Sequence, residues 1–149
     1  IYSGFSGLAG GQYFDLAYEN KKISKKKIID IQSKKTGKLF AFCCECVGII
    51  KNQSYNKRKI LKKIGSDIGL LFQITDDLID YKGDSKTAGK PTRKDKKKGK
   101  PTLVNLLGYK KTLTFAKSLK NKINKNVKNY GTKSKDLLES IEFILNRKS

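Results

Sequence analysis

Apolar residues recur along most of this chain at the spacing of amphipathic helices. Between residues 24 and 50, and again from 54 to about 82, they lie three or four positions apart. A weaker version of the pattern follows residue 109. This spacing predicts α-helices, because residues three or four apart share one face of a helix. No stretch alternates apolar and polar residues for long enough to predict a strand. We therefore expect an all-α protein of five or six helices.

Short polar residues and glycines mark the expected ends of these helices. Ser24 and Ser54 stand where an N-cap would begin the two long helices. Gly83 is expected to end the second of them, and Gly131 to interrupt the lysine-rich and asparagine-rich helix near the C-terminus. Ser134 then begins a last helix with one apolar side.

Two segments depart from this pattern. Residues 81–101 hold both prolines of the chain, three glycines and nine Lys or Arg residues, which predicts a long functional loop. A short apolar helix is expected after it, at 102–107. The first 19 residues carry glycines at helical spacing, and such glycines let a neighbouring helix or a ligand approach closely. The chain has room for one compact unit, so we expect a single domain over 1–149.

One helix carries three carboxylates on an otherwise apolar stretch. Gln73, Asp76, Asp77 and Asp80 follow the i, i+3, i+4, i+7 rule and are expected to share one face. Carboxylates gathered in this way repel one another, and burying them costs free energy unless cations pair with them. They suit Mg²⁺, which favours one or two carboxylates together with substrate phosphates. The alternative is a solvated acidic stripe, and the spacing alone leaves both interpretations open.

The charge balance is strongly positive, with 34 Lys or Arg residues against 13 Asp or Glu and a formal net charge of +21. Such a field attracts nucleic acid, phosphorylated metabolites or anionic membrane surfaces. The basic segments lack the interleaved aromatic residues of dedicated RNA-binding modules, so we expect no specific nucleic-acid binding. No apolar run approaches the ~20 residues of a membrane span.

Three cysteines lie close together, at Cys43, Cys44 and Cys46, in a chain without histidine. A zinc site would need a fourth ligand, so we expect them to be small core residues. An odd number of cysteines without a disulfide framework favours a reducing, cytoplasmic location. The chain also contains no methionine, even at position 1, and we interpret it as the C-terminal piece of a longer protein.

The acidic stripe and the basic loop together predict a diphosphate site. Carboxylates would hold Mg²⁺ on the phosphate oxygens, and lysines on neighbouring segments would neutralise the remaining charge. The candidate lysines are Lys35, Lys90 and Lys100. In so lysine-rich a chain, a single lysine is more often an exposed surface residue than part of a site. The choice between these two interpretations therefore rests on the spacing of the other motifs.

Four blocks resemble, in the same order, the short-chain trans-prenyl diphosphate synthases (the farnesyl and geranylgeranyl diphosphate synthase group). They are Gly-Gln-x-x-Asp at 11–15, Lys-Thr-Gly at 35–37, Phe-Gln-x-x-Asp-Asp-x-x-Asp at 72–80, and a loop with Gly-Lys at 89–90 and Gly-Lys-Pro-Thr at 99–102. The resemblance implies the C-terminal half of an isoprenoid-synthase-type helical bundle. The family's first Asp-rich motif and its Arg-lined isopentenyl diphosphate site have no counterpart here.

The resemblance also implies a role for each matching residue. The implied Mg²⁺ ligands are Asp76, Asp77, Asp80 and Asp95. The implied diphosphate contacts are Lys35, Lys90 and Lys100. The implied stabilisers of an allylic cation are Thr36, Gln73 and the carbonyl of Lys35, which Gly37 would expose by loosening the helix. Gln12 and Asp15 would support the cavity.

The implied activity is a Mg²⁺-dependent condensation of an allylic diphosphate with isopentenyl diphosphate. We expect it in a full-length protein that forms a homodimer, and we expect the 149-residue chain alone to be inactive. The alternatives are a non-catalytic partner subunit or diphosphate-binding fragment, and a basic nucleic-acid-binding helical protein. The length of the prenyl product stays open, with a farnesyl product favoured.

Overall fold

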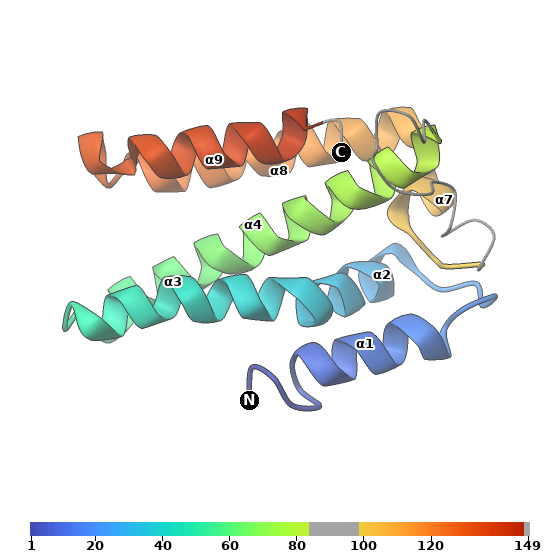
Figure 1. Cartoon of the computed structure of the whole chain (residues 1–149), viewed down its shortest axis with the longest axis horizontal. Coiled ribbons are helices and arrows are strands. Elements are labelled where there is room, and N and C mark those ends of the chain that lie inside the picture. The colour runs from blue at the N-terminus through green and yellow to red at the C-terminus, as the bar shows by residue number, and fades with distance from the viewer. Residues whose placement is uncertain (84–98, 148–149) are drawn as a thin grey trace.

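The computed structural model describes residues 1–83 and 99–147, and every regular element in those ranges is a helix (Figure 1). In chain order the elements are α1 (Leu8–Ala17), α2 (Lys25–Gln32), the π-helical turn η1 (Ser33–Gly37), α3 (Lys38–Ile50), α4 (Tyr55–Lys82), α7 (Leu103–Leu107), α8 (Tyr109–Lys128), the 3₁₀ turn η2 (Gly131–Ser134) and α9 (Lys135–Asn146). The expected all-α fold is confirmed.

The first long helix predicted from the sequence is a run of three segments, α2, η1 and α3. Ser24 caps it as expected, because its Oγ accepts a hydrogen bond from the backbone N–H of Lys27 at 3.2 Å. The π-helical turn η1 coincides with the Lys-Thr-Gly block. A π turn inserts an extra residue into the helix and is frequent at functional sites. The expected loosening of the helix at this block is therefore present.

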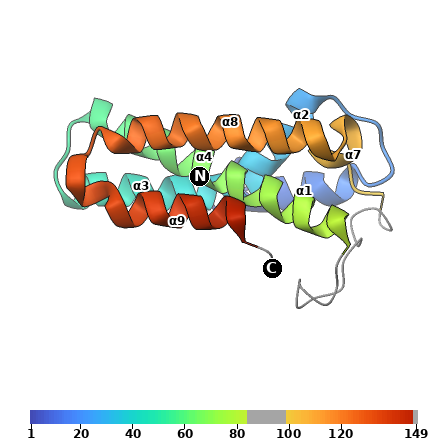
Figure 2. The same cartoon turned by 90° about the horizontal axis from the view of Figure 1, so that it is seen from above.

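Helix α4 runs through the middle of the molecule, with α3 on one side and α8 and α9 on the other (Figures 1 and 2). Its buried apolar residues include Ile64, Ile68, Leu71, Ile74 and Leu78. Gly83 ends α4 in the left-handed conformation, with φ 73°, as the sequence predicts. Ser54 stands at the N-cap position, but its side chain makes no capping hydrogen bond.

Helices α8 and α9 form an antiparallel hairpin that covers α4 (Figure 2). Gly131 turns the chain between them with φ 69°, where a side chain would be strained. Ile123 of α8 and Ile141 of α9 are fully buried and belong to the hydrophobic core. Lys120 pairs with Glu142 across its outer side at 2.8 Å. The packing of this hairpin holds the C-terminal end of the chain close to α4.

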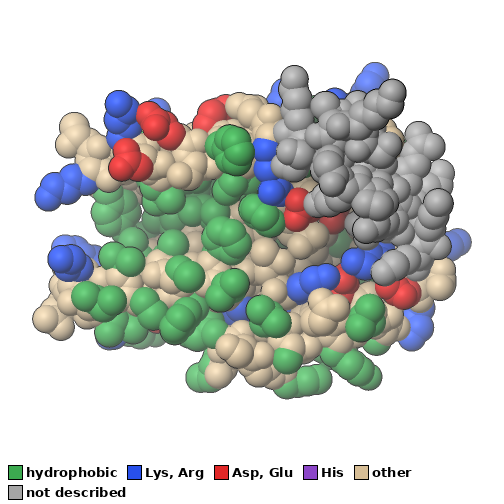
Figure 3. All heavy atoms as spheres, viewed as in Figure 1, with side chains coloured by type: hydrophobic (Ala, Val, Ile, Leu, Met, Phe, Trp, Pro, Cys, Tyr) green, Lys and Arg blue, Asp and Glu red, His purple; other side chains and the backbone are tan. Residues whose placement is uncertain are grey.

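Helix α3 leaves an apolar stripe uncovered. The stripe consists of Leu39, Phe42, Val47 and Ile50, whose side chains are 45% to 74% exposed. Figure 3 shows hydrophobic side chains gathered over this side of the molecule. The periodic pattern between residues 24 and 50 thus predicted the helix, but part of its apolar side faces solvent instead of the core.

Contrary to the prediction from the sequence, the three cysteines do not all lie in the core. Cys43 is exposed, whereas Cys44 and Cys46 are half-buried, so the prediction that all three are core residues is wrong. Burial raises the pKa of the Cys44 thiol, and the neighbouring Cys43 adds to the rise. Cys44 therefore favours its neutral thiol form. None of the helices that the structure describes is both long and apolar enough to cross a membrane.

Candidate functional site

The site is built around a direct backbone contact between α1 and the π-helical turn η1. A Cβ atom placed on Gly11 would lie 2.2 Å from the backbone nitrogen of Lys35 and 2.5 Å from its Cα. Only glycine fits this approach. One turn further along α1, Asp15 consequently reaches the side chain of Lys35. The Gly-Gln-x-x-Asp block thus acts through its glycine and its aspartate together.

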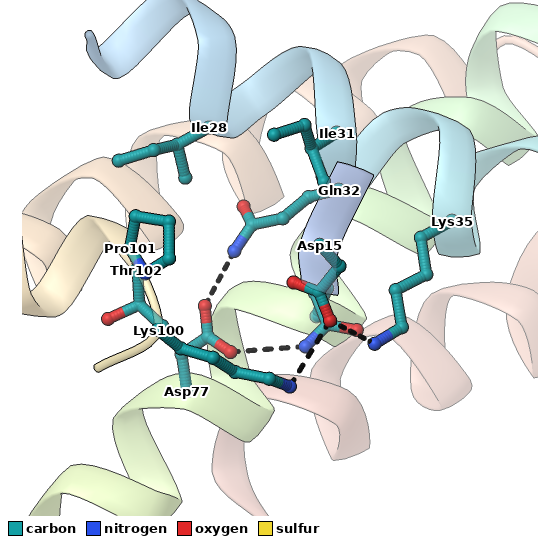
Figure 4. Close-up of a pocket in the computed structure, with 10 residues that line it drawn as sticks. Asp15, Ile28, Ile31, Gln32, Lys35, Asp77, Lys100, Pro101 and Thr102 are labelled. Carbon is teal, nitrogen blue, oxygen red and sulfur yellow. Dashed lines mark hydrogen bonds and ion pairs between the residues drawn. The ribbon is translucent and has the colours of Figure 1, made fainter. Parts of the chain in front are cut away.

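Asp15 holds two lysines from different parts of the chain. Its Oδ2 lies 2.6 Å from Nζ of Lys35 and 3.2 Å from Nζ of Lys100 (Figure 4). All three side chains are mostly buried, with 18% to 25% of their surface exposed. Two ammonium groups kept this close repel each other, and the carboxylate between them offsets that repulsion. The arrangement leaves two cations ready to bind a doubly charged anion.

A chain of hydrogen bonds runs beside these lysines. The hydroxyl of Thr36 donates to Oε1 of Gln73 at 3.0 Å, and Nε2 of Gln73 donates to Oδ1 of Asp77 at 3.1 Å. From the other side, Nε2 of Gln32 donates to Oδ2 of Asp77 at 2.6 Å. Asp77 is only 3% exposed. These bonds fix the orientation of the Gln73 amide, whose oxygen is directed toward Thr36.

Asp76 turns to a different neighbour. Its Oδ1 accepts a hydrogen bond from Nη2 of Arg147 at 2.6 Å, at the end of α9. Asp80 is half-buried one turn further along α4. The predicted acidic face is therefore divided, with Asp77 directed toward α2 and Asp76 toward the C-terminal end. Within 1–83 and 99–147, no three acidic or cysteine side chains converge on a common point that would hold a metal ion.

Five of the residues predicted from the sequence line one pocket: Asp15, Lys35, Gln73, Asp77 and Lys100 (Figure 4). Ile28, Ile31, Gln32, Pro101 and Thr102 complete its lining. Thr36 joins the site through its bond to Gln73. Gln12 is exposed on α1 and does not line this pocket. Lys90 and Asp95 lie outside the described residues.

Sequence reasoning missed two residues of the site. Gln32 lies one helical turn before Thr36, and that spacing was the only signal that it shares a face with the Lys-Thr-Gly block. Arg147 is one of three arginines among 34 basic residues. Since arginine is the side chain best suited to a fixed pairing with a carboxylate, its scarcity here was an unused signal.

The chain is similar to known proteins over most of its length. Residues 3–141 match the family model of polyprenyl synthetase. Over 150 aligned positions the chain is 32% identical to the farnesyl diphosphate synthase of Escherichia coli (strain K12), covering 97% of this chain and 50% of that protein. An FPP/GFPP synthase from Zymomonas mobilis, solved without ligand, aligns with a TM-score of 0.81 at 36% identity, over 97% of this chain and 47% of that one.

A geranyltransferase from Helicobacter pylori, solved in complex with magnesium and isoprenyl diphosphate, aligns with a TM-score of 0.79 at 28% identity, over 96% of this chain and 47% of its own. The chain thus spans about half the length of these relatives. Its all-helical fold corresponds to about half of an isoprenoid synthase chain. The match to the family model includes all four blocks that contribute residues to the pocket, at 11–15, 35–37, 72–80 and 99–102. The chain belongs to the polyprenyl synthetase family.

Proposed function

We propose that this chain supplies the diphosphate-binding half of a prenyltransferase site, which condenses an allylic diphosphate with isopentenyl diphosphate. The observation that carries the proposal is the cluster of Asp15, Lys35 and Lys100 beside the Gln73–Asp77 pair. A cationic pair next to oriented amide and hydroxyl groups suits a substrate with an anionic diphosphate and a cationic carbon centre. Membership of the family, and the isoprenyl diphosphate bound to the Helicobacter pylori relative, support the same substrate class.

The carboxylates of α4 fit a magnesium ion that is shared with the substrate. Asp76 and Asp80 are one helical turn apart and only partly buried, so their oxygens can reach a common ligand. Mg²⁺ needs one or two carboxylates when phosphate oxygens complete its coordination, so a third converging side chain is not required. When bound, the ion supplies positive charge that stabilises the departing diphosphate. Asp77, committed to Gln32 and Gln73, serves to position the amide.

The remaining residues act on the two ends of the substrate. Lys35 and Lys100 would exchange Asp15 for the diphosphate oxygens, which carry more negative charge than a single carboxylate. Thr36 and Gln73 would present oxygen dipoles to the allylic cation. Because these oxygens belong to a hydroxyl and an amide already engaged in hydrogen bonds, they stabilise the cation without trapping it.

The exposed apolar stripe of α3 indicates that further helices pack against this chain. A soluble protein seldom exposes a long row of large apolar residues unless another surface covers it. The chain spans about half of its relatives' length, and we propose that the remaining helices of such a bundle cover this stripe and close the pocket. The isolated chain would then bind a diphosphate without catalysing condensation. A diphosphate-binding subunit is the second candidate function, because the lysine pair and the pocket lie within this one chain.

Binding of inorganic pyrophosphate tests whether the lysine pair binds a diphosphate. Calorimetric titration of the 149-residue chain in the presence of Mg²⁺ should give saturable binding that Lys35→Gln weakens by at least tenfold. Lys26→Gln on the exposed first turn of α2 removes the same charge and should change little. Equal effects of the two substitutions would refute a specific site. Condensation product formed by the purified chain alone would refute the half-site.

A further inference from the structure

Near the C-terminal end of the chain, a largely buried arginine contacts the acidic stripe. Arg147 directly follows α9, and only 11% of its side chain is exposed. Its Nη2 lies 2.6 Å from Oδ1 of Asp76 and 3.2 Å from the backbone oxygen of Phe72. Its Cζ lies 4.0 Å from the centre of the Phe72 ring. Three separate contacts therefore hold this guanidinium in place.

The packing of two helices determines this position. Phe72 and Asp76 lie four residues apart on α4, so they share the face that α9 covers. Ile141 is fully buried, and Ile144 and Leu145 pack against the core, which fixes the end of α9 over α4. Arg147 itself is extended, with φ −61° and ψ 147°, so the backbone leaves the helix there. Its side chain reaches α4 from that point.

We propose that Arg147 is an internal counter-ion of Asp76 that competes with the divalent metal for this carboxylate. The inference rests on Asp76 being a metal ligand, as in the proposed function. The guanidinium contacts Oδ1 of Asp76 at 2.6 Å, so a divalent ion held by the same carboxylate would share it with a second cation. Both carry positive charge, and the low exposure of the Arg147 side chain, 11%, limits screening of that charge by water. Metal binding at Asp76 would therefore favour withdrawal of the arginine.

The docking geometry is compatible with withdrawal. Nε of Arg147 is buried and makes no hydrogen bond to any described residue, so the docked state leaves one donor unsatisfied. Release returns that donor to water. The backbone N–H of Arg147 still donates to the carbonyl oxygen of Phe143 at 2.9 Å, but withdrawal of the side chain alone does not break this bond. In this arrangement Arg147 neutralises the charge of Asp76, and a metal ion bound to Asp76 would replace the arginine as its counter-ion.

Titration with Mn²⁺ alone, followed by electron paramagnetic resonance, tests the competition on the full 149-residue chain. Arg147→Gln removes the positive charge and should tighten Mn²⁺ binding about tenfold. Arg147→Lys keeps the charge and should stay within about threefold of the wild type. Lys135→Gln removes a charge at the opposite end of α9, ~18 Å away along the helix, and should change nothing. Circular dichroism confirms that each variant is folded.

A second measurement needs no variant. The chain has three arginines, so the Nε–H signals of their side chains are few enough to follow by nuclear magnetic resonance. Addition of Mg²⁺ should move the Arg147 signal toward that of a solvated arginine and leave Arg58 unchanged. A docked Arg147 signal at saturating Mg²⁺ would overturn the proposal, as would equal or weaker Mn²⁺ binding by Arg147→Gln.

Asp76→Asn distinguishes between two hypotheses: that Asp76 is a metal ligand, and that Arg147 competes with the metal for it. If this substitution leaves Mn²⁺ binding unchanged, Asp76 is not a metal ligand, and both the metal site and the competition are wrong. If it abolishes binding while Arg147→Gln has no effect, the metal site stands and only the competition is refuted.

Discussion

Replacing Gly11 by alanine places a methyl group where the backbone of η1 already lies. The added Cβ would be 2.2 Å from the Lys35 nitrogen and 2.8 Å from the carbonyl carbon of Lys34. It is therefore roughly 1 Å too close for ordinary van der Waals contact. Because the opposing atoms belong to backbone, no side chain can swing aside, and α1 must move away from η1.

The size of the effect follows from two opposing terms. Overfilling a packed contact costs typically 1–3 kcal/mol, and the close approach here argues for the upper part of that range. Alanine in place of glycine within a helix recovers about 0.5–1 kcal/mol. We expect a net loss of about 1.5–2 kcal/mol in the free energy of unfolding. For a chain of this length that lowers the melting temperature by about 3–8 °C.

Thermal unfolding followed by circular dichroism at low protein concentration measures this loss. Gly4→Ala is the matched control, because a Cβ on Gly4 meets no atom within 4 Å. Pyrophosphate binding should also weaken in Gly11→Ala, since the movement of α1 carries Asp15 and disturbs its pairing with Lys35. A Gly11→Ala protein that melts at or above the Gly4→Ala control would refute the contact between α1 and η1.

Three further predictions concern the site and the surface around it. Asp15→Asn removes the carboxylate that competes for the two site lysines, so calorimetry should show pyrophosphate binding tightened about threefold to tenfold, and weaker binding would contradict the competition. Asp77→Asn should lower the free energy of unfolding in urea by about 1–3 kcal/mol, because a buried acceptor of two amide donors is lost; an unchanged urea midpoint would argue against those hydrogen bonds. Sedimentation should show self-association that rises with concentration and is reduced by Val47→Glu combined with Ile50→Glu, whereas equal behaviour of the variant would exclude the stripe of α3 as the contact surface.

Local sequence determined the helices and most of their ends. Ser24 caps α2, and Gly83 and Gly131 provide left-handed turns, because capping and positive φ depend on the residue itself and its near neighbours. The order of the short motifs was also sufficient to recognise the family, which the match over residues 3–141 confirms. The caps, the turns and each single motif involve residues within a few positions of one another, and the order of the motifs is read directly along the chain.

Other features depended on which segments meet in space. The pattern of α3 predicted an apolar side but not whether anything covers it. Leu39 and Phe42 on that side are exposed, and Cys43, which was predicted to be a core residue, is exposed as well. Periodicity reports the direction of side chains around one helix axis, whereas burial depends on the neighbours of that helix. The Mg²⁺ ligands predicted on α4 remain a prediction.

The sequence by itself determined that this is an all-α chain of the polyprenyl synthetase family with its acidic and basic motifs in order. Only the tertiary structure decided how the acidic stripe is divided. Asp77 pairs with Gln32, 45 residues away, and Asp76 pairs with Arg147, 71 residues away. The physical reason is that one turn of helix sets which residues lie near each other along α4, while the packing of α2 and α9 selects the partner of each carboxylate.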